Sequence, residues 1–521
     1  MSLPEYLVFS VNEENEDVRY LSFTADQKWL RFGPEEGVLS VTAKFAIEPA
    51  SDGLIHIRSC YDNHYWVRYS VSEPWLSTSA PEPVEDQSKD NCTLFKPEMS
   101  SDTNFVSLLH VRSGLNVGMC PAGDDNAYNL CVQQSSPASL FRCINYASLV
   151  KLHKYNLIIG DNGRFLRVRT IRNKPFIQME SVGPSDPDNG FETFVTRNGN
   201  IRIKSIVPGK FLCLDHTDSF NWILADYAAE SDPTNPNTLF EVVSSPVLSL
   251  RCLGNNHFCK RYTNTMNENC LAALGKSTED KFIRLRFINL ANPVYSYVTV
   301  KNFRHPRVYN TETEEILTNQ VLENVNGLNL VARIRKNGHI HTIKQSFSNS
   351  VTHEPSVANF FSPIPFLTED GQVAMTEEVA SLGSTRWGNT RDSSSPKDVV
   401  MSYLLPPRTR VTASLIALTA TFEVPFSYHV SDEFHSNNGS ATQDLDDGVF
   451  TGIYTYATRV RIDLVEPLST HQVCFPFIYS HYLFFLGYST CNLIFNQIVF
   501  YGPKFTITSF KRNDFFKSKI S

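Results

Sequence analysis

Along the first 293 residues, short runs of alternating hydrophobic and polar residues follow one another, separated by clusters of Gly, Pro, Asn and Asp. No run keeps a 3.6-residue apolar period for long, so the pattern does not predict helices there. Closely spaced alternating runs with turn residues between them are typical of an all-β barrel or sandwich. Clear examples are residues 6–9, 55–58 and 65–69. We therefore expect an all-β fold.

One of these stretches, residues 53–97, occurs a second time about 147 residues later, from Gly199 onwards. The period is far longer than that of a solenoid repeat, so each copy is expected to be a whole domain with its own core. The matching positions keep residue type and order: Ile55, Ile57, Ser59, Trp75, Thr93, Leu94 and Phe95 correspond to Ile201, Ile203, Ser205, Trp222, Thr238, Leu239 and Phe240.

A shorter theme recurs within the first copy. A basic or aromatic residue followed by an apolar one appears about every 45 residues, at 19–21, 65–67 and 115–117. Three-fold recurrence of this size predicts a β-trefoil. We therefore expect two tandem β-trefoil domains, at residues 1–147 and 148–293.

From Tyr295 the runs become longer and richer in Thr, Ser and Val, as in residues 297–301 and 410–422. Long strands with polar alternation predict an elongated antiparallel domain, here residues 294–470, that is solvated on one face. Within it, residues 346–395 are poor in apolar runs. We expect this segment to move without unfolding its neighbours, because few apolar contacts should hold it.

The last part of the chain, residues 471–521, has a different composition, with ten of the 36 Phe and a single acidic residue, Asp514. A membrane anchor would need about 20 uninterrupted apolar residues, and Pro476 and Pro503 interrupt this segment. The alternative is an artefact of gene prediction, which would aggregate if it were made. The sequence favours the second interpretation.

Composition narrows the class of protein. A hydrophobic content of 41%, a charged content of 19% and a net charge of -7 describe a folded chain with no basic face for nucleic acid. The first 18 residues lack the features of a secretory signal, so a cytoplasmic or nucleocytoplasmic location is expected. The eleven Cys show no CxxC pairing, which predicts reduced thiols and no metal site.

Trp75 and Trp222 occupy equivalent places in the two copies. An indole stacks well on the apolar face of a sugar while polar neighbours bind its hydroxyls. The alternative is that both indoles are core anchors, since Trp buries much apolar area. The candidate carbohydrate-binding residues are Trp222, Asn221, Asp226, Trp75, Ser72 and Glu73.

No motif predicts catalysis. The pair Asp446-Asp447 precedes Gly448, and an Asp-Gly step is typical of a turn between strands. The sequence has no nucleophile motif and no phosphate-binding glycine loop. We expect a non-enzymatic protein without a cofactor.

Several motifs resemble known families. DGLIHIRS, DNHYWVR, CTLFKP, GNIRIKS and DSFNWILAD resemble the tandem agglutinin domains of amaranthin-like plant lectins. IPFLTEDG, STRWGNT, PPRTRV, VPFSY and LDDGVFTG resemble the aerolysin-like β-pore-forming module. The resemblance implies two β-trefoils followed by an elongated aerolysin-like β domain. It also implies binding of glycans or glycoproteins of the galactose or N-acetylgalactosamine, T-antigen-like type, and a role in plant defence or stress.

The resemblance further implies a homodimer or higher homo-oligomer and membrane pores. The chain departs from the family's pattern at two places, which bear on its sugar specificity and on pore formation. The family's first-domain loop reads Asn-His-Tyr-Trp, whereas this chain has Ser72-Glu73-Pro74-Trp75. Residues 346–395 also lack the strict alternation of a membrane-spanning β-hairpin. The alternative from another class is a non-catalytic interaction protein whose trefoils bind protein partners.

Overall fold

The computed structural model describes residues 3–468 apart from 13–17, 24–28, 101–103, 120–127, 134–138, 218, 229–231, 245–246, 353–354 and 436–438. Strands dominate these residues, and the helices among them are single 3-10 turns of three residues each. The predicted all-β class is confirmed. The predicted tail, residues 471–521, lies outside the described residues.

The strands form three large hydrogen-bonded sheets and one small one. The first contains β1 (Tyr6–Asn12), β2 (Val18–Ser22), β3 (Arg31–Gly33), β4 (Phe45–Pro49), β5 (Ile55–Ser59), β6 (Tyr65–Arg68), β7 (Leu76–Ala80), β8 (Phe95–Met99), β9 (Phe105–His110), β10 (Leu115–Met119), β11 (Leu130–Gln133) and β12 (Phe141–Asn145).

The second sheet contains β13 (Tyr155–Ile159), β14 (Phe165–Ile171), β15 (Lys174–Ser181), β16 (Gly190–Val195), β17 (Ile201–Ser205), β18 (Phe211–Asp215), β19 (Trp222–Tyr227), β20 (Phe240–Ser244), β21 (Leu248–Cys252), β22 (His257–Tyr262), β23 (Cys270–Gly275) and β24 (Arg286–Asn289). The 3-10 turns are η1 (Val41–Ala43), η2 (Ser51–Gly53), η3 (Tyr146–Ser148), η4 (Pro187–Asn189), η5 (Pro236–Thr238) and η6 (Lys281–Ile283).

A buried phenylalanine recurs three times in each of these two sheets, at the first or second residue of a strand. The intervals are about 45 to 50 residues, and each side chain is 1% exposed or less. Each set of three belongs to the core cluster of its own sheet. The recurrence is the three-fold repeat expected of a β-trefoil, and it lies at the same places in both copies: Phe45, Phe95 and Phe141 in the first, Phe191, Phe240 and Phe287 in the second.

A polar cap precedes each of the three phenylalanines in the second copy. The side chains of Asp186, Asn235 and Asp280 each accept the backbone N–H two residues ahead and so begin η4, η5 and η6. These caps satisfy N–H groups that the short turns leave without an internal partner.

We expect Asn235→Ala to destabilise the second domain by about 1 kcal/mol, because the Asn237 N–H then loses its acceptor at 3.0 Å. Asn235→Asp, which keeps the acceptor, should cost much less. Urea unfolding followed by hydrogen exchange in peptides from 190–262 measures both. Equal losses for the two variants would contradict a capping role.

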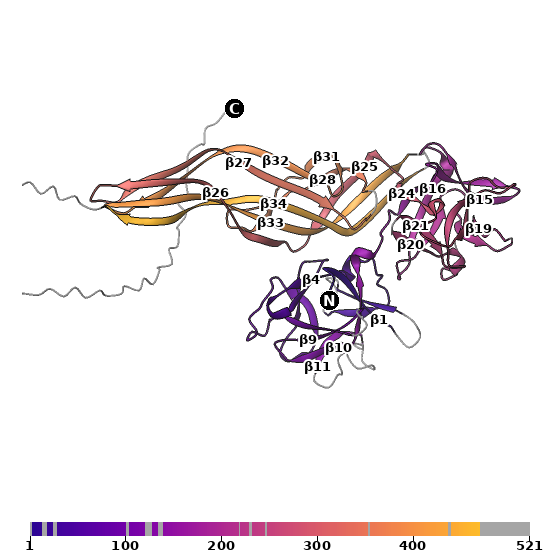
Figure 1. Cartoon of the computed structure of the whole chain (residues 1–521), viewed down its shortest axis with the longest axis horizontal. Coiled ribbons are helices and arrows are strands. Elements are labelled where there is room, and N and C mark those ends of the chain that lie inside the picture. The colour runs from indigo at the N-terminus through magenta and orange to yellow at the C-terminus, as the bar shows by residue number, and fades with distance from the viewer. Residues whose placement is uncertain are drawn as a thin grey trace, which may run out of the picture. The chain divides into compact units, whose positions relative to one another are not determined.

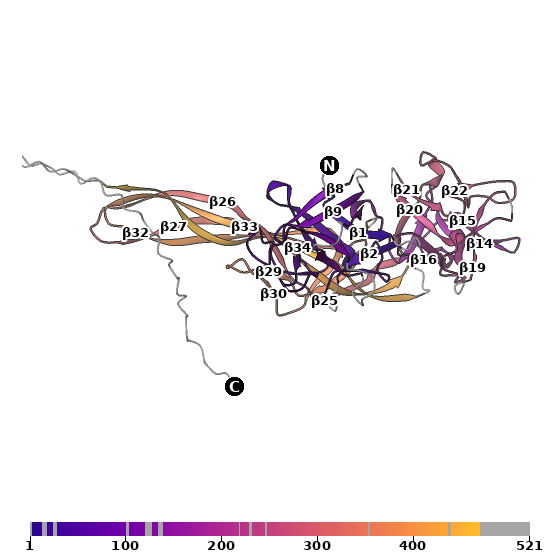
Figure 2. The same cartoon turned by 90° about the horizontal axis from the view of Figure 1, so that it is seen from below.

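The third sheet is built from much longer strands. Their order is β31-β28-β25-β33-β34-β27-β32, and β26 pairs with β33. The long strands run side by side in both views (Figures 1 and 2). They are β25 (Ala291–Phe303), β26 (Arg307–Asn324), β27 (Leu330–Ser348), β32 (Thr390–Leu405), β33 (Thr409–Phe434) and β34 (Ser440–Pro467).

The pair β33 and β34 forms the centre of this sheet. These strands have 26 and 28 residues and stay paired from Thr409↔Pro467 to Glu433↔Ser440. At about 3.3 Å per residue, each spans roughly 80 to 90 Å. Two separate apolar clusters lie along them. The expected elongated antiparallel domain is confirmed, while the limits 1–147, 148–293 and 294–470 stay a prediction.

An insertion, residues 349–389, joins β27 to β32. It contains β28 (Val357–Ser362), the hairpin β29 (Pro365–Leu367) and β30 (Val373–Met375), and β31 (Ala380–Arg386). β28 pairs in parallel with β25 and antiparallel with β31, so both strands lie at one edge of the sheet.

The expectation that few apolar contacts hold residues 346–395, which include this insertion, is wrong. Phe360, Leu367 and Trp387 are buried in the core of the sheet. Trp387 packs on Phe360 with ring centroids 4.7 Å apart. Isolated large side chains therefore anchor the segment, although they do not form an apolar run in the sequence.

Candidate functional site

Trp222, the first residue of β19, is 1% exposed and lies inside an aromatic cluster. The rings of Phe176, Phe220 and Tyr262 each lie 5.7 Å from its ring. No face of this indole is open to a sugar in the structure. This burial corrects the expectation that the Trp222 indole stacks on a sugar, and it agrees with the alternative of a core anchor.

The other two second-domain candidates do not assemble around Trp222. Asn221 has a left-handed backbone, φ 47°, and its carbonyl accepts the Ala273 N–H at 2.8 Å. Asp226 is exposed, with one oxygen 3.5 Å from the Lys210 ammonium. Because Asp226 follows Trp222 by four residues on one strand, it lies about 13 Å further along it. One monosaccharide cannot contact both.

The first-domain candidates lie together in the loop between β6 and β7. The Glu73 carbonyl accepts from Arg68 Nε at 3.2 Å, and its N–H donates to Ser70 Oγ at 3.1 Å. The hydroxyls of Ser70 and Ser72 are 3.1 Å apart. These contacts connect the residues of the loop to one another, and Ser72 is exposed while Trp75 is half-buried at the end of the loop.

Two further aromatic residues flank this loop. The Trp29 ring lies 4.6 Å from that of Tyr69, edge on, and 5.9 Å from that of Trp75. Trp29 and Trp75 are half-buried, while Tyr69 is 46% exposed. Partly exposed aromatic faces beside hydroxyl and carboxylate groups are what a sugar site requires.

The sequence reasoning did not select Trp29 or Tyr69. A signal for Trp29 was present, since the offset of about 147 residues places it opposite Phe176. The pair Trp29 and Trp75 in the first domain thus corresponds to Phe176 and Trp222 in the second. The two copies share this aromatic pair but differ in its exposure.

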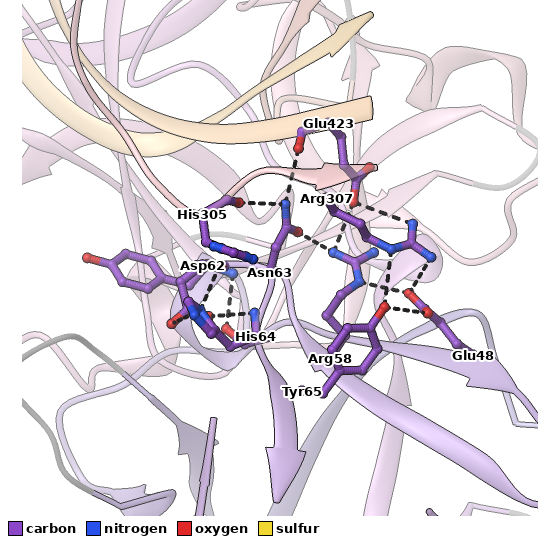
Figure 3. A network of polar contacts seen from close by, with 11 residues as sticks. Glu48, Arg58, Asp62, Asn63, His64, Tyr65, His305, Arg307 and Glu423 are labelled. Atoms are coloured by element: carbon purple, nitrogen blue, oxygen red, sulfur yellow. Dashed lines mark hydrogen bonds and ion pairs between the residues drawn. The ribbon is translucent and has the colours of Figure 1, made fainter. Parts of the chain in front are cut away.

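The motif DNHYW lies at a contact between the first domain and the third sheet (Figure 3). Asn63 is 1% exposed, with a left-handed φ of 62°. Its amide donates to the carbonyls of His305 at 3.1 Å and Glu423 at 3.3 Å. Tyr65 and Trp66 are buried. This motif therefore serves structure and domain contact in the described chain.

Asp446 and Asp447 also lie at a domain contact. Asp447 accepts from Tyr428 Oη at 2.9 Å and pairs with Lys151 Nζ at 2.8 Å. Burial alone would raise its pKa, but the Lys151 ammonium and the hydroxyl donors lower the pKa of Asp447 to about 2. The carboxylate is thus held ionised as a structural partner of Lys151.

Among the described residues, no group of three or more His, Cys, Asp or Glu is placed to hold a metal ion. None of the helices in this part of the chain is long and apolar enough to cross a membrane.

These features define a class of protein, in which two duplicated β domains with internal three-fold repeats precede a long-stranded antiparallel sheet. The model of the agglutinin domain matches residues 1–137 and 151–282, just over half of the chain. The chain belongs to the agglutinin-domain family, and its first two domains are carbohydrate-binding lectin domains. No curated protein matches the chain in sequence.

Solved structures show more distant likenesses. The hemolytic lectin CEL-III is 10% identical over 89% of this chain and 94% of its own, with a TM-score of 0.28. A mosquitocidal holotoxin is 10% identical over 54% of this chain, with a TM-score of 0.24, and the chain spans 33% of its length. A Polyporus squamosus lectin is 12% identical over 27% of this chain and 51% of its own, with a TM-score of 0.24. At these values none of them bears on function.

Proposed function

We propose that the protein is a non-catalytic lectin that binds glycans containing galactose or N-acetylgalactosamine through its first domain. The observation that carries the proposal is the partly exposed cluster of Trp29, Tyr69 and Trp75 beside the ordered loop with Ser72 and Glu73. An indole face would stack on the apolar side of the sugar, and the Glu73 carboxylate and Ser72 hydroxyl would bind its hydroxyls.

The two domains differ in the exposure of their equivalent tryptophans, so Trp222 serves as a control for Trp75. Trp222 has the equivalent place, but Phe220 and Tyr262 cover it. In this proposal the second domain has no sugar site of its own. It increases avidity only if it takes part in assembling a second copy of the chain, which brings a second first-domain site. The expected homodimer or higher oligomer, the cytoplasmic or nucleocytoplasmic location and a role in plant defence or stress are part of the same proposal.

We further propose that the third domain forms membrane pores after the lectin binds. Binding to a glycan raises the local concentration of the third domain at the membrane, which favours assembly by mass action. The segment that would enter the bilayer is the insertion 349–389, which lies at an edge of the sheet and pairs with β25 along one parallel strand. To leave, it would have to withdraw Phe360, Leu367 and Trp387 from the core of the sheet.

Trp75→Ala is expected to weaken binding to galactose-terminated glycans by about tenfold or more, because the stacking face is lost. Trp222→Phe, which keeps the second-domain core filled, should leave binding within about twofold. Glycan-array binding and titration with a galactoside measure both effects.

Three results of these binding measurements would change the proposal. Loss of binding in Trp222→Phe but not in Trp75→Ala would move the site to the second domain. Binding to a different sugar that still needs Trp75 would overturn the galactose specificity alone. A folded protein that binds no glycan would favour the alternative, a protein whose first two domains bind protein partners.

A further inference from the structure

The contact between the first domain and the third sheet is polar. Each of the apolar core clusters formed by the described residues stays within 3–149, 150–291 or 298–462. A cavity of about 320 Å³, lined by Tyr6, Lys44, Arg58, Glu423 and other residues, lies in this contact. A polar and incompletely packed contact between domains is one that can separate without unfolding either side.

Charged side chains connect the two sides (Figure 3). Arg58 pairs with Glu48 of its own domain at 2.8 Å and with Glu423 of the third sheet at 2.9 Å. Arg307 of the third sheet pairs with Glu48 at 2.9 Å, and its Nε lies 3.3 Å from the Tyr65 hydroxyl. Two of these pairs, Arg58–Glu423 and Arg307–Glu48, cross the contact between the domains.

Two histidines meet at the edge of this network. The rings of His64 and His305 lie against each other, tilted by 34°, with centroids 4.5 Å apart. His64 comes from the first domain and His305 from the start of the third, so this ring pair exists only while the domains are in contact. Two imidazoles this close are compatible when at least one is neutral, but they repel each other when both carry a proton.

The carboxylates near the histidine pair belong to the first domain. Asp62 places its carboxylate 3.3 Å from His64 Nδ1. Burial of the ring and the charge of the neighbouring His64 lower the pKa of His305. The hydrogen bond with the Pro81 backbone and the carboxylates of Asp62 and Glu82 offset this only in part.

Docking of the first domain on the third sheet depends on pH through His305. The pKa of His305 is lowered from its ordinary 6.5 while the domains are in contact, and it returns to that value on separation. Below pH 6.5 the separated form therefore binds more protons than the docked form. Docking is fully favoured above about pH 6.5 and weakens as the pH falls.

We propose that the His64–His305 ring pair is an acid-sensitive latch that releases the first lectin domain from the third sheet. The first domain stays tethered after release, because Arg197 of the second domain donates to the Val18 carbonyl at 2.7 Å and accepts from Val38 at 2.8 Å. Opening is therefore a rotation that uncovers the side of the third sheet around Arg307 and Glu423. The proposal does not require that the third domain forms pores.

The test is small-angle X-ray scattering on the full chain, combined with hydroxyl-radical footprinting of Tyr61 and Tyr65. Between pH 7.5 and 5.5 we expect a reversible increase in radius of gyration and stronger labelling of both tyrosines. The docking constant should fall by up to about tenfold for one proton bound on release. Circular dichroism at both pH values checks that the domains stay folded.

Three variants separate the latch from a general effect of acid. His305→Gln is expected to remain docked at pH 5.5, and His305→Lys, charged throughout, to be open already at pH 7.5. His216→Asn, in the second domain, should behave like the wild type. The same pH response in wild type and His305→Gln, or no response in the wild type, would overturn the proposal.

Discussion

Arg58→Ala is expected to lower the free energy of unfolding of the first domain by about 3–5 kcal/mol, one of the two largest effects that we predict. Arg58 is 3% exposed, and its guanidinium is the closest cationic partner of two carboxylates, Glu48 and Glu423. Without it, the partners that Glu48 keeps among the described residues are Arg307 and the Tyr65 hydroxyl, and Glu423 keeps Arg307 at 3.8 Å. A partly buried carboxylate that loses its nearest cationic partner is costlier than an absent pair.

The pKa of Glu48 supports this assignment. Burial would raise it, but the charges and hydrogen bonds of Arg58, Arg307 and Tyr65 lower it below its ordinary 4.5. A lowered carboxyl pKa stabilises the fold above that ordinary value, and the stabilisation is lost as the pH falls through the lower one. In Arg58→Ala the free energy of unfolding of the first domain should therefore be lower at pH 7.5, and it should fall less between pH 7.5 and pH 4 than in the wild type.

The measurement is urea unfolding at pH 7.5 and pH 4, followed by hydrogen exchange in first-domain peptides. Glu423→Gln is the matched control, because it removes the charge on the third-sheet side and leaves the Arg58–Glu48 pair intact. Its effect on the first domain should stay below about 1 kcal/mol. If Glu423→Gln destabilises the first domain as much as Arg58→Ala, the internal pair with Glu48 is not what stabilises it.

The sequence was sufficient for the architecture because the fold is repetitive. Alternating short runs predicted the strands, and an offset of about 147 residues related Phe95 to Phe240 and Trp75 to Trp222. Strand length could also be predicted for the third sheet, since the polar and apolar alternation of residues 410–422 continues without turn residues. These properties are local, and a single chain displays them without any knowledge of contacts.

The site could be predicted only in part, because exposure depends on residues that are distant in sequence. The duplication makes Trp75 and Trp222 equivalent, but Tyr262, 40 positions further on, is among the residues that cover Trp222. Asn63 looked like part of a lectin motif, and its amide partner His305 is 242 positions away. Neither contact leaves a pattern in the sequence around the residue concerned.

The second large effect is expected from a disulfide that joins the insertion to the sheet. Tyr297 of β25 and Asn359 of β28 are register partners in the parallel pairing, and the Asn359 amide donates to the carbonyls of Val294 and Ser296 at 3.2 Å each. Oxidised Tyr297→Cys/Asn359→Cys should lose leakage activity at least tenfold on liposomes that carry galactose-terminated glycolipids, because β28 can no longer leave β25. Reduction with dithiothreitol should restore it.

The matched control keeps the same position in β28 and changes only its partner. Asn359 is also in register with Ser384 of β31, so Asn359→Cys/Ser384→Cys joins two strands within the insertion and leaves the contact with β25 free. This variant should leak like the wild type in both redox states. If both disulfides block leakage equally, the insertion must unfold internally rather than detach as a unit. If neither disulfide blocks leakage, another segment enters the bilayer. If the wild-type protein binds the liposomes and causes no leakage, the third domain does not form pores.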